Sequence, residues 1–339
     1  MSTGYSRVKA AIKGETEEVA AYPIIGAITT KYVGKTVKEY LTDTEVIISG
    51  QLAAYEDLKQ DAITVEADML IEAEAMGSQL AFPEDNICHA ISYPLKTNKG
   101  KIDKLQIPDP HKDGRIPYIL EACKQLKKAI TNAPVGGVLV GPWSIAISLR
   151  DMKELIFDTF DDPQYVHDLM KITTETARVC GDAMLETGVS LSFTDAAASC
   201  DIISPGIYKE FIKPYHIELF KHFKNRKAGV TLHICGNTRP ILRDMVETGA
   251  TALSIDSKVP LSKAVEIIGK DTVIIGNVET NLFVQRDNAN LKDAIKKCLD
   301  EALKRSRYIL CTGCEVPINA SLDSIRLFMK IARELGGKA

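Results

Sequence analysis

The chain alternates short apolar runs with helical segments, and this alternation constrains its fold more than any other feature. Eight runs have the length and composition of buried strands, with helical segments between them. They cover residues 19–26, 62–69, 135–140, 191–194, 229–235, 252–255, 273–275 and 308–310. Parallel strands need crossover connections, which helices supply. The sequence therefore predicts an α/β protein of the (β/α)8 TIM-barrel class, with residues 1–339 forming one domain.

One stretch departs from the alternation. Residues 77–115, which follow the second expected strand, contain four prolines, a lysine-rich run and few periodic apolar positions. Excursions of this length in a compact domain usually serve as lids or partner surfaces. We therefore expect an irregular excursion over one face of the protein, followed by an amphipathic helix at 116–130.

Composition excludes several classes of function. The 339 residues are 45% hydrophobic with a net charge of −3, so a polyanion-binding surface and a nucleic-acid partner are not expected. The amino-terminal residues lack the apolar segment of a signal peptide, and no run approaches the eighteen apolar residues of a membrane span. We expect a cytoplasmic protein without a membrane partner, whose eight cysteines are thiols, ligands or core residues.

Residues capable of chemistry gather at or just after the carboxyl ends of the expected strands. They are Trp143, Asp195, His233, Cys235, Asp256, Asn277 and Cys314. In a parallel barrel these strand ends meet at one mouth, where active sites are built. We therefore expect these side chains to share one site.

The most informative local pattern is His233-Ile-Cys235, at the end of the fifth expected strand. Residues two apart on a strand project to the same side, and imidazole with thiolate is a donor pair that zinc prefers. A zinc site needs a third ligand. Cys314, which lies 79 residues beyond Cys235, follows the eighth strand and would reach the same mouth.

Several short motifs together resemble a known family. They are Leu232-His-Ile-Cys-Gly236, Leu253-Ser-Ile-Asp256, Gly276-Asn-Val278 and Thr312-Gly-Cys314, with Gly141-Pro142 and Phe193-Thr-Asp195 upstream. From Gly136 onward the chain is similar to the methylcobamide:coenzyme M methyltransferases of the uroporphyrinogen decarboxylase superfamily. The resemblance implies a (β/α)8 barrel that binds one Zn²⁺ through His233, Cys235 and Cys314. It also implies transfer of a methyl group to a thiol such as coenzyme M from a methylcobamide carried by a separate corrinoid-binding protein.

The same resemblance implies roles for the other strand-end residues. Asp195, Asp256 and Asn277 would be catalytic or substrate-positioning groups, and Trp143 would contact the cofactor. Asp256 stands where family members carry a glutamate, one methylene longer, which bears on its part as a displaceable fourth ligand. Cys311, which makes a Cys-x-x-Cys with Cys314, is expected to be a neighbour of the metal site and not a ligand.

Two alternatives remain open on the residues alone. The enzyme could work in the opposite direction, so that a methyl donor such as an ether, amine, thioether or halide methylates the corrinoid protein. A metal-free decarboxylase on the same barrel is disfavoured because the loop after the first strand, residues 26–31, has no arginine for the carboxylates of a tetrapyrrole. The cobalamin-like pattern Asp109-Pro-His-Lys-Asp-Gly114 lies within the excursion and is not expected to bind cobalt, so the corrinoid should arrive on a partner.

Overall fold

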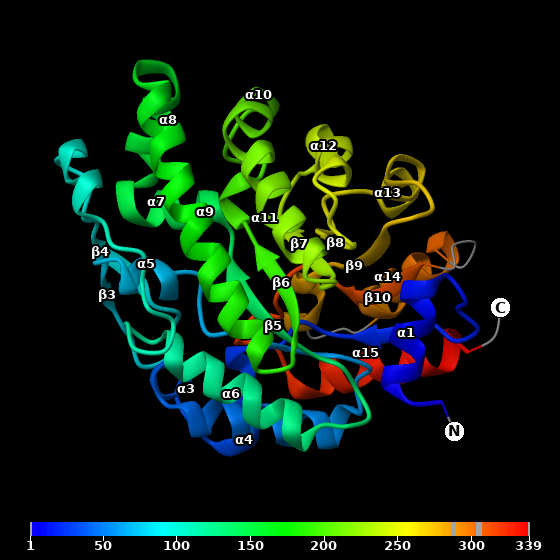
Figure 1. Cartoon of the computed structure of the whole chain (residues 1–339). Helices are drawn as coiled ribbons and strands as arrows, with labels where there is room; N and C mark the ends of the chain where they lie inside the picture. Colours follow the sequence, from blue (N-terminus) through cyan, green and yellow to red (C-terminus); the bar gives the residue numbers. More distant parts are fainter. Residues whose placement is uncertain (1, 286–288, 303–306, 338–339) are drawn as a thin grey trace.

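In the computed structural model, which describes residues 2–285, 289–302 and 307–337, eight parallel strands form one sheet surrounded by helices (Figure 1). The strands are β1 (Ala20–Tyr22), β2 (Ile63–Val65), β5 (Val135–Val140), β6 (Ser190–Thr194), β7 (Val230–Ile234), β8 (Ala252–Ile255), β9 (Val273–Val278) and β10 (Tyr308–Thr312). Their order is β1-β10-β9-β8-β7-β6-β5-β2, and each neighbouring pair is parallel. The predicted (β/α)8 barrel is confirmed, in a nearly closed form.

Helices occupy the connections between the strands, as parallel pairing requires. The α-helices are α1 (Gly4–Lys13), α2 (Thr30–Val33), α3 (Val37–Thr42), α4 (Thr44–Leu58), α5 (Ile71–Ala75), α6 (Ile116–Ala129), α7 (Pro142–Arg150), α8 (Met152–Asp161), α9 (Pro163–Glu186), α10 (Pro205–Ile207), α11 (Lys213–Asn225), α12 (Leu242–Glu247), α13 (Leu261–Ile268), α14 (Ala289–Ala302) and α15 (Leu322–Leu335). The α9 helix begins where capping by Asp162 and a proline at its first position predict. No helix in the described part of the chain combines the length and apolar character that a membrane crossing requires.

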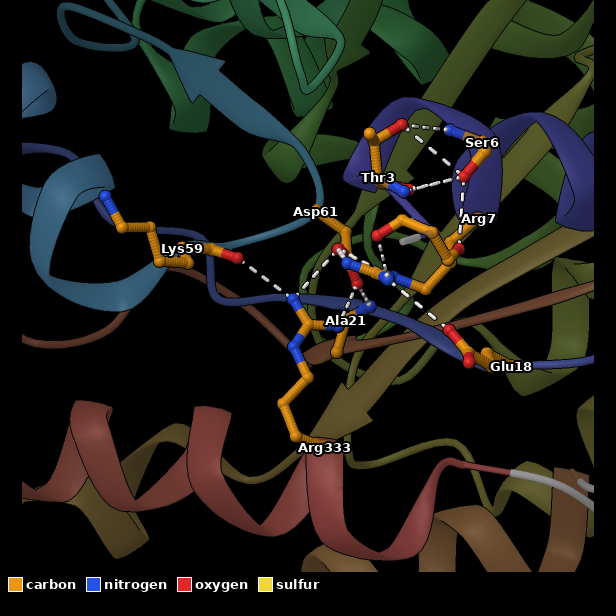
Figure 2. A network of polar contacts seen from close by, with 9 residues as sticks. Thr3, Ser6, Arg7, Glu18, Ala21, Lys59, Asp61 and Arg333 are labelled. Atoms are coloured by element: carbon orange, nitrogen blue, oxygen red, sulfur yellow. Dashed lines mark hydrogen bonds and ion pairs between the residues drawn. The ribbon is translucent and has the colours of Figure 1, made fainter.

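The barrel has a seam between β1 and β2, which do not pair as strands, and Asp61 bridges it. The Asp61 amide donates to the Ala21 carbonyl (2.9 Å), and the Ala21 amide donates to Asp61 Oδ2 (2.8 Å). Arg7 from α1 and Arg333 from α15 each donate to the same carboxylate at 2.6 Å (Figure 2). One fully buried carboxylate thus joins both ends of the chain to the seam, and Figure 1 shows the two termini on the same side of the molecule.

Apolar residues pack in two clusters, one on each side of the strands. The larger cluster fills the space between the strands and the surrounding helices. The smaller contains alternate residues of β1, β9 and β10, among them Tyr22, Ile275 and Cys311. Because strand residues two apart face the same side, this smaller cluster lies inside the barrel. Val8 and Ala11 of α1 belong to it, so α1 covers the amino-terminal end.

Three expectations about the elements need correction. The excursion 77–115 is not irregular throughout, because β3 (Gln79–Ala81) and β4 (His89–Ser92) pair as an antiparallel hairpin beside α5 (Figure 1). Strand β9 runs to Val278, so Asn277 lies within a strand and not after one. Helix α7 was not expected, and it places Trp143 in its first turn with no solvent exposure.

Candidate metal centre and pocket

Three of the predicted site residues come together at the carboxyl ends of two strands. His233 lies in β7, Cys235 directly follows β7, and Cys314 lies two residues beyond β10. One donor atom from each lies within 4.8 Å of the others. Among the described residues this is the only group of three or more such donors that could hold a metal ion. The donor set of one imidazole and two thiols is the kind that zinc prefers.

The strand register fixes the orientation of the imidazole. His233 pairs across the β7–β8 ladder with Ser254, so the two side chains lie next to each other. Their Nδ1 and Oγ atoms are 2.9 Å apart, a hydrogen bond that leaves Nε2 for another partner. Metal-binding histidines in general have such a partner on their second nitrogen, because it sets the tautomer and the ring angle.

The two thiols affect each other's protonation. The contact with Cys314 lowers the pKa of Cys235, while the same contact together with burial raises the pKa of Cys314. Cys235 therefore loses its proton at a lower pH than Cys314, because a second negative charge beside the first is unfavourable. A divalent cation would compensate for both negative charges, so the residues fit a zinc ion.

The loop behind Cys235 is held by Asp256. Its Oδ2 accepts the Gly236 amide and its Oδ1 accepts the Lys258 amide, both at 2.9 Å. Gly236 has a φ of +77°, and a Cβ there would lie 2.4 Å from Ser199 Oγ, so the turn requires glycine. Asp256 is not part of the three-donor group, and its predicted place as a fourth ligand stays a prediction.

The three donors line a cavity of about 500 Å³ at the barrel mouth. The remaining walls are largely apolar and include Leu41, Met69, Leu70, Leu139, Val140, Ile147 and Met152. The excursion contributes Ile87, Cys88, His89, Ala90 and Tyr93 to this lining. The excursion therefore forms part of the wall of the cavity that the three donors share.

Asp195 and Trp143 lie outside this lining. Asp195 has no solvent exposure, and its carboxylate accepts the amides of Trp143 (3.2 Å) and Ser144 (2.8 Å) at the start of α7. The Asp195 carboxylate also lies 2.9 Å from His216 Nε2. The Asp195 carboxylate therefore caps α7 and contacts a buried histidine. The structure does not bring Asp195 or Trp143 to the three donors.

Asn277 also lies outside the lining. Its Nδ2 donates to the carbonyls of Asp256 (3.0 Å) and Val259 (2.7 Å), and its Oδ1 accepts from Cys298 of α14 (3.7 Å). Asn277 therefore braces the loop that carries Asp256. Its connection to the candidate site runs through that loop.

The family model for uroporphyrinogen decarboxylase (URO-D) matches residues 5–335. The chain belongs to the uroporphyrinogen decarboxylase family. Within it, the chain is 26% identical over 299 residues to the methylcobamide:CoM methyltransferase MtaA of Methanosarcina barkeri, covering 87% of this chain and 86% of that protein. It is 23% identical over 303 residues to the uroporphyrinogen decarboxylase of Carboxydothermus hydrogenoformans, covering 86% and 83%.

A solved structure of a methyltransferase from Methanosarcina mazei has the same fold. It matches with a TM-score of 0.89 at 24% identity, over 98% of this chain and 99% of that chain. The family resemblance drawn from the sequence motifs is thus confirmed, with both methyltransferases and decarboxylases among the relatives.

This URO-D family member has two pocket residues that the sequence reasoning missed, Glu66 and Glu315. A Cβ on Gly26 would lie 2.6 Å from Glu315 Oε1 and 2.8 Å from Glu66 Oε1, so both carboxylates converge on one point above this glycine. Glu66 Oε1 is buried without a hydrogen-bond partner, and Glu315 Oε1 accepts the Ala27 amide (3.3 Å). Burial, together with Glu315 and Cys314, raises the pKa of Glu66 well above its usual range.

A signal for both glutamates was present in the sequence. Glu66 directly follows β2 and Glu315 directly follows Cys314, so both satisfy the strand-end rule. The expected second strand, 62–69, was too long and hid Glu66 in its middle.

Proposed function

We propose that this protein is a zinc-containing, corrinoid-dependent methyltransferase that transfers a methyl group to a thiol from a methylated corrinoid carried on a separate protein. The observation that supports this proposal is the convergence of His233, Cys235 and Cys314 on the wall of an apolar pocket. The relatives named methylcobamide:CoM methyltransferase and methylated-thiol–coenzyme M methyltransferase support the same reaction class.

The donor set suits activation of a thiol. A free thiol with a pKa of about 8.5 is only a few per cent thiolate at neutral pH. A zinc ion held by these three residues would keep a substrate sulfur deprotonated and leave one coordination position open to it. Two cysteine thiolates would balance the charge of the ion while His233 adds none, so the substrate sulfur would stay electron-rich.

The residues around the donors have separate tasks in this scheme. Ser254 fixes the ring of His233, Asp256 holds the loop behind Cys235, and the apolar walls exclude water from the reacting sulfur. In the transfer itself a lone pair of the substrate sulfur would form the new sulfur–carbon bond, and the partner's corrinoid would keep the electron pair of the bond that breaks. The thiol proton would leave for solvent when the thiol binds.

The corrinoid is proposed to be supplied by a partner protein. His111, within the cobalamin-like pattern 109–114, is 61% exposed and lies 3.7 Å from Glu186 on the surface, away from the pocket lining. This position supports the expectation that the pattern does not bind cobalt. The predicted contact of Trp143 with the corrinoid stays a prediction.

Two rival reactions make different demands on the pocket. A decarboxylase acting on a tetrapyrrole with many carboxylates needs basic groups, but no lysine or arginine is among the described residues that line the pocket. This feature disfavours decarboxylation. Transfer in the opposite direction, from a methyl donor to the corrinoid protein, uses the same three donors and is separated by product analysis.

Metal content and methyl transfer test the proposal on the same samples. Wild-type protein is expected to carry about one zinc per chain, and Cys314→Ala is expected to lose it together with transfer from methylcobalamin to a thiol. Cys311→Ala is the matched control, because Cys311 is a buried thiol of β10 in the barrel interior. Folded wild-type protein, purified without chelator and free of zinc, would contradict the proposal, as would equal zinc loss in the two variants.

A further inference from the structure

The charge of the pocket walls indicates what the substrate carries. Four carboxylates line the cavity, those of Glu66, Asp68, Asp151 and Glu315, whereas no lysine or arginine is found among its described lining residues. A pocket that binds an anionic group ordinarily presents a guanidinium, an ammonium or several free amides to it.

Two of the four carboxylates are neutralised from behind the wall. Asp68 accepts from Arg115 at 2.6 Å, and Asp151 pairs with Lys96 at 2.9 Å. Neither basic residue is part of the lining. These two acids therefore present little net charge to a molecule in the cavity.

The other two carboxylates have no such compensation. Neither Glu66 nor Glu315 forms an ion pair with any described residue, and the buried Oε1 of Glu66 has no hydrogen-bond partner. Buried polar atoms are usually paired, so an unpaired oxygen facing a cavity indicates a missing donor. Because Glu315 directly follows Cys314, this unpaired acidic pair lies beside the three candidate metal ligands.

We propose that the pocket takes a small, largely apolar thiol, or its methylated form, whose body is neutral or carries an ammonium group, and that Glu66 and Glu315 select against anionic thiols. This inference rests on the function proposed above and narrows its substrate class. A sulfonate or carboxylate on the substrate would be buried in a poorly solvated cavity whose described lining offers no ammonium or guanidinium group to compensate its charge. An ammonium or hydroxyl group would supply the missing donor.

Three thiols that differ only in their terminal group test the charge preference. They are 2-mercaptoethylamine, 2-mercaptoethanol and 2-mercaptoethanesulfonate, titrated by calorimetry into zinc-loaded protein at neutral pH. We expect affinity to fall in that order, with the amine binding at least tenfold more tightly than the sulfonate. Binding is read directly, so the result does not depend on methyl transfer.

A single variant separates the pocket from the chemistry of the thiols. Glu66→Gln is expected to reduce the amine-to-sulfonate affinity ratio several-fold. The intrinsic acidity of each thiol is the same with both proteins, so a change in the ratio reports the carboxylate. Glu84→Gln is the matched control, because Glu84 is an exposed excursion residue paired with Lys38 outside the pocket. It should leave the ratio unchanged.

The outcomes distinguish this inference from the function on which it rests. Zinc-loaded wild-type protein that binds the sulfonate as tightly as the neutral thiol would overturn the charge preference and leave the zinc site standing. An amine preference that survives unchanged in Glu66→Gln would overturn the role of this carboxylate. Protein that holds no zinc and binds none of the thiols would overturn both proposals, and the metal content identifies that case.

Discussion

Carboxylates are buried at both ends of the barrel, but the two ends satisfy them differently. At the amino-terminal end Asp61 accepts from two guanidinium groups and a backbone amide, and it closes the seam between β1 and β2 (Figure 2). At the mouth, Glu66 and Glu315 lie close together without a basic partner among the described residues. In the first arrangement other residues of the chain supply the partners of the carboxylate. In the second a hydrogen-bond donor is missing, and a ligand can supply it.

The difference separates stability from binding. Removing one partner of a buried ion pair leaves the others unpaired, which destabilises a fold by several kcal/mol. A buried carboxylate with no partner has a desolvation cost that no stabilising contact offsets. Replacing it is therefore expected to leave the free energy of unfolding unchanged or to raise it. Binding sites in general keep such locally unfavourable groups because the ligand completes them.

The largest effect is expected at the amino-terminal end. Asp61→Ala leaves Arg7 and Arg333 without their common partner and opens the seam at Ala21, so the free energy of unfolding should fall by about 3 to 5 kcal/mol. Urea unfolding measures this change. The control is Glu18→Gln, because Glu18 is a 43% exposed partner of Arg7 and should change stability by less than about 1 kcal/mol. Equal losses of stability in the two variants would contradict the structural role of the Asp61 network.

A pH-dependent effect on stability is expected at Glu72 of α5, which is buried behind the mouth. Its Oε1 accepts the Val140 amide (3.1 Å), its Oε2 has no partner, and burial raises its pKa to about 7. Because the folded pKa lies above the ordinary value of 4.5, the folded state binds the proton more tightly. The associated stability is fully present below 4.5 and is lost as the pH rises to about 7.

Glu72→Gln removes this pH dependence while its amide oxygen can still accept the Val140 amide. Above neutral pH the variant should be more stable than wild type, by up to about 3 kcal/mol. Urea unfolding across this pH window measures the difference. A parallel pH dependence in both proteins would show that Glu72 does not titrate in the window.

The fold was predictable because its signals are local. The bounds of β5 and β8 agree with those expected, since the two apolar runs are followed by Gly141 and Asp256. Side-chain alternation placed His233 and Cys235 on one side, and the barrel topology brought Cys314 to them.

The remaining features depend on contacts between distant residues. Nothing in the local sequence indicates that Asp61 lies between Arg7 and Arg333, or that Asp195 caps α7 from another strand. Glu66 and Glu315 each satisfy the strand-end rule, but their convergence without a basic partner among the described residues becomes visible only in the assembled mouth.

At the mouth, the hydrogen bond between His233 and Ser254 should affect metal affinity more than stability. Ser254→Ala frees the imidazole to rotate or change tautomer, and loss of such a partner typically weakens metal binding about 10- to 100-fold. Competition with a chelator measures zinc affinity. Ser192 of β6, which also lines the pocket, provides the control variant Ser192→Ala. Unchanged affinity in Ser254→Ala would remove this serine from the metal site.

The smallest effect on stability is expected from Glu66→Gln. This variant tests whether a buried carboxylate at the mouth contributes to the fold as Asp61 does at the amino-terminal end. Because Glu66 Oε1 has no hydrogen-bond partner among the described residues, the substitution breaks no hydrogen bond of this atom. The free energy of unfolding should therefore stay within about 1 kcal/mol of wild type or rise. Urea unfolding in the absence of substrate measures it. A loss as large as that of Asp61→Ala would mean that the fold depends on this carboxylate. The mouth would then be completed by the chain and not by a ligand.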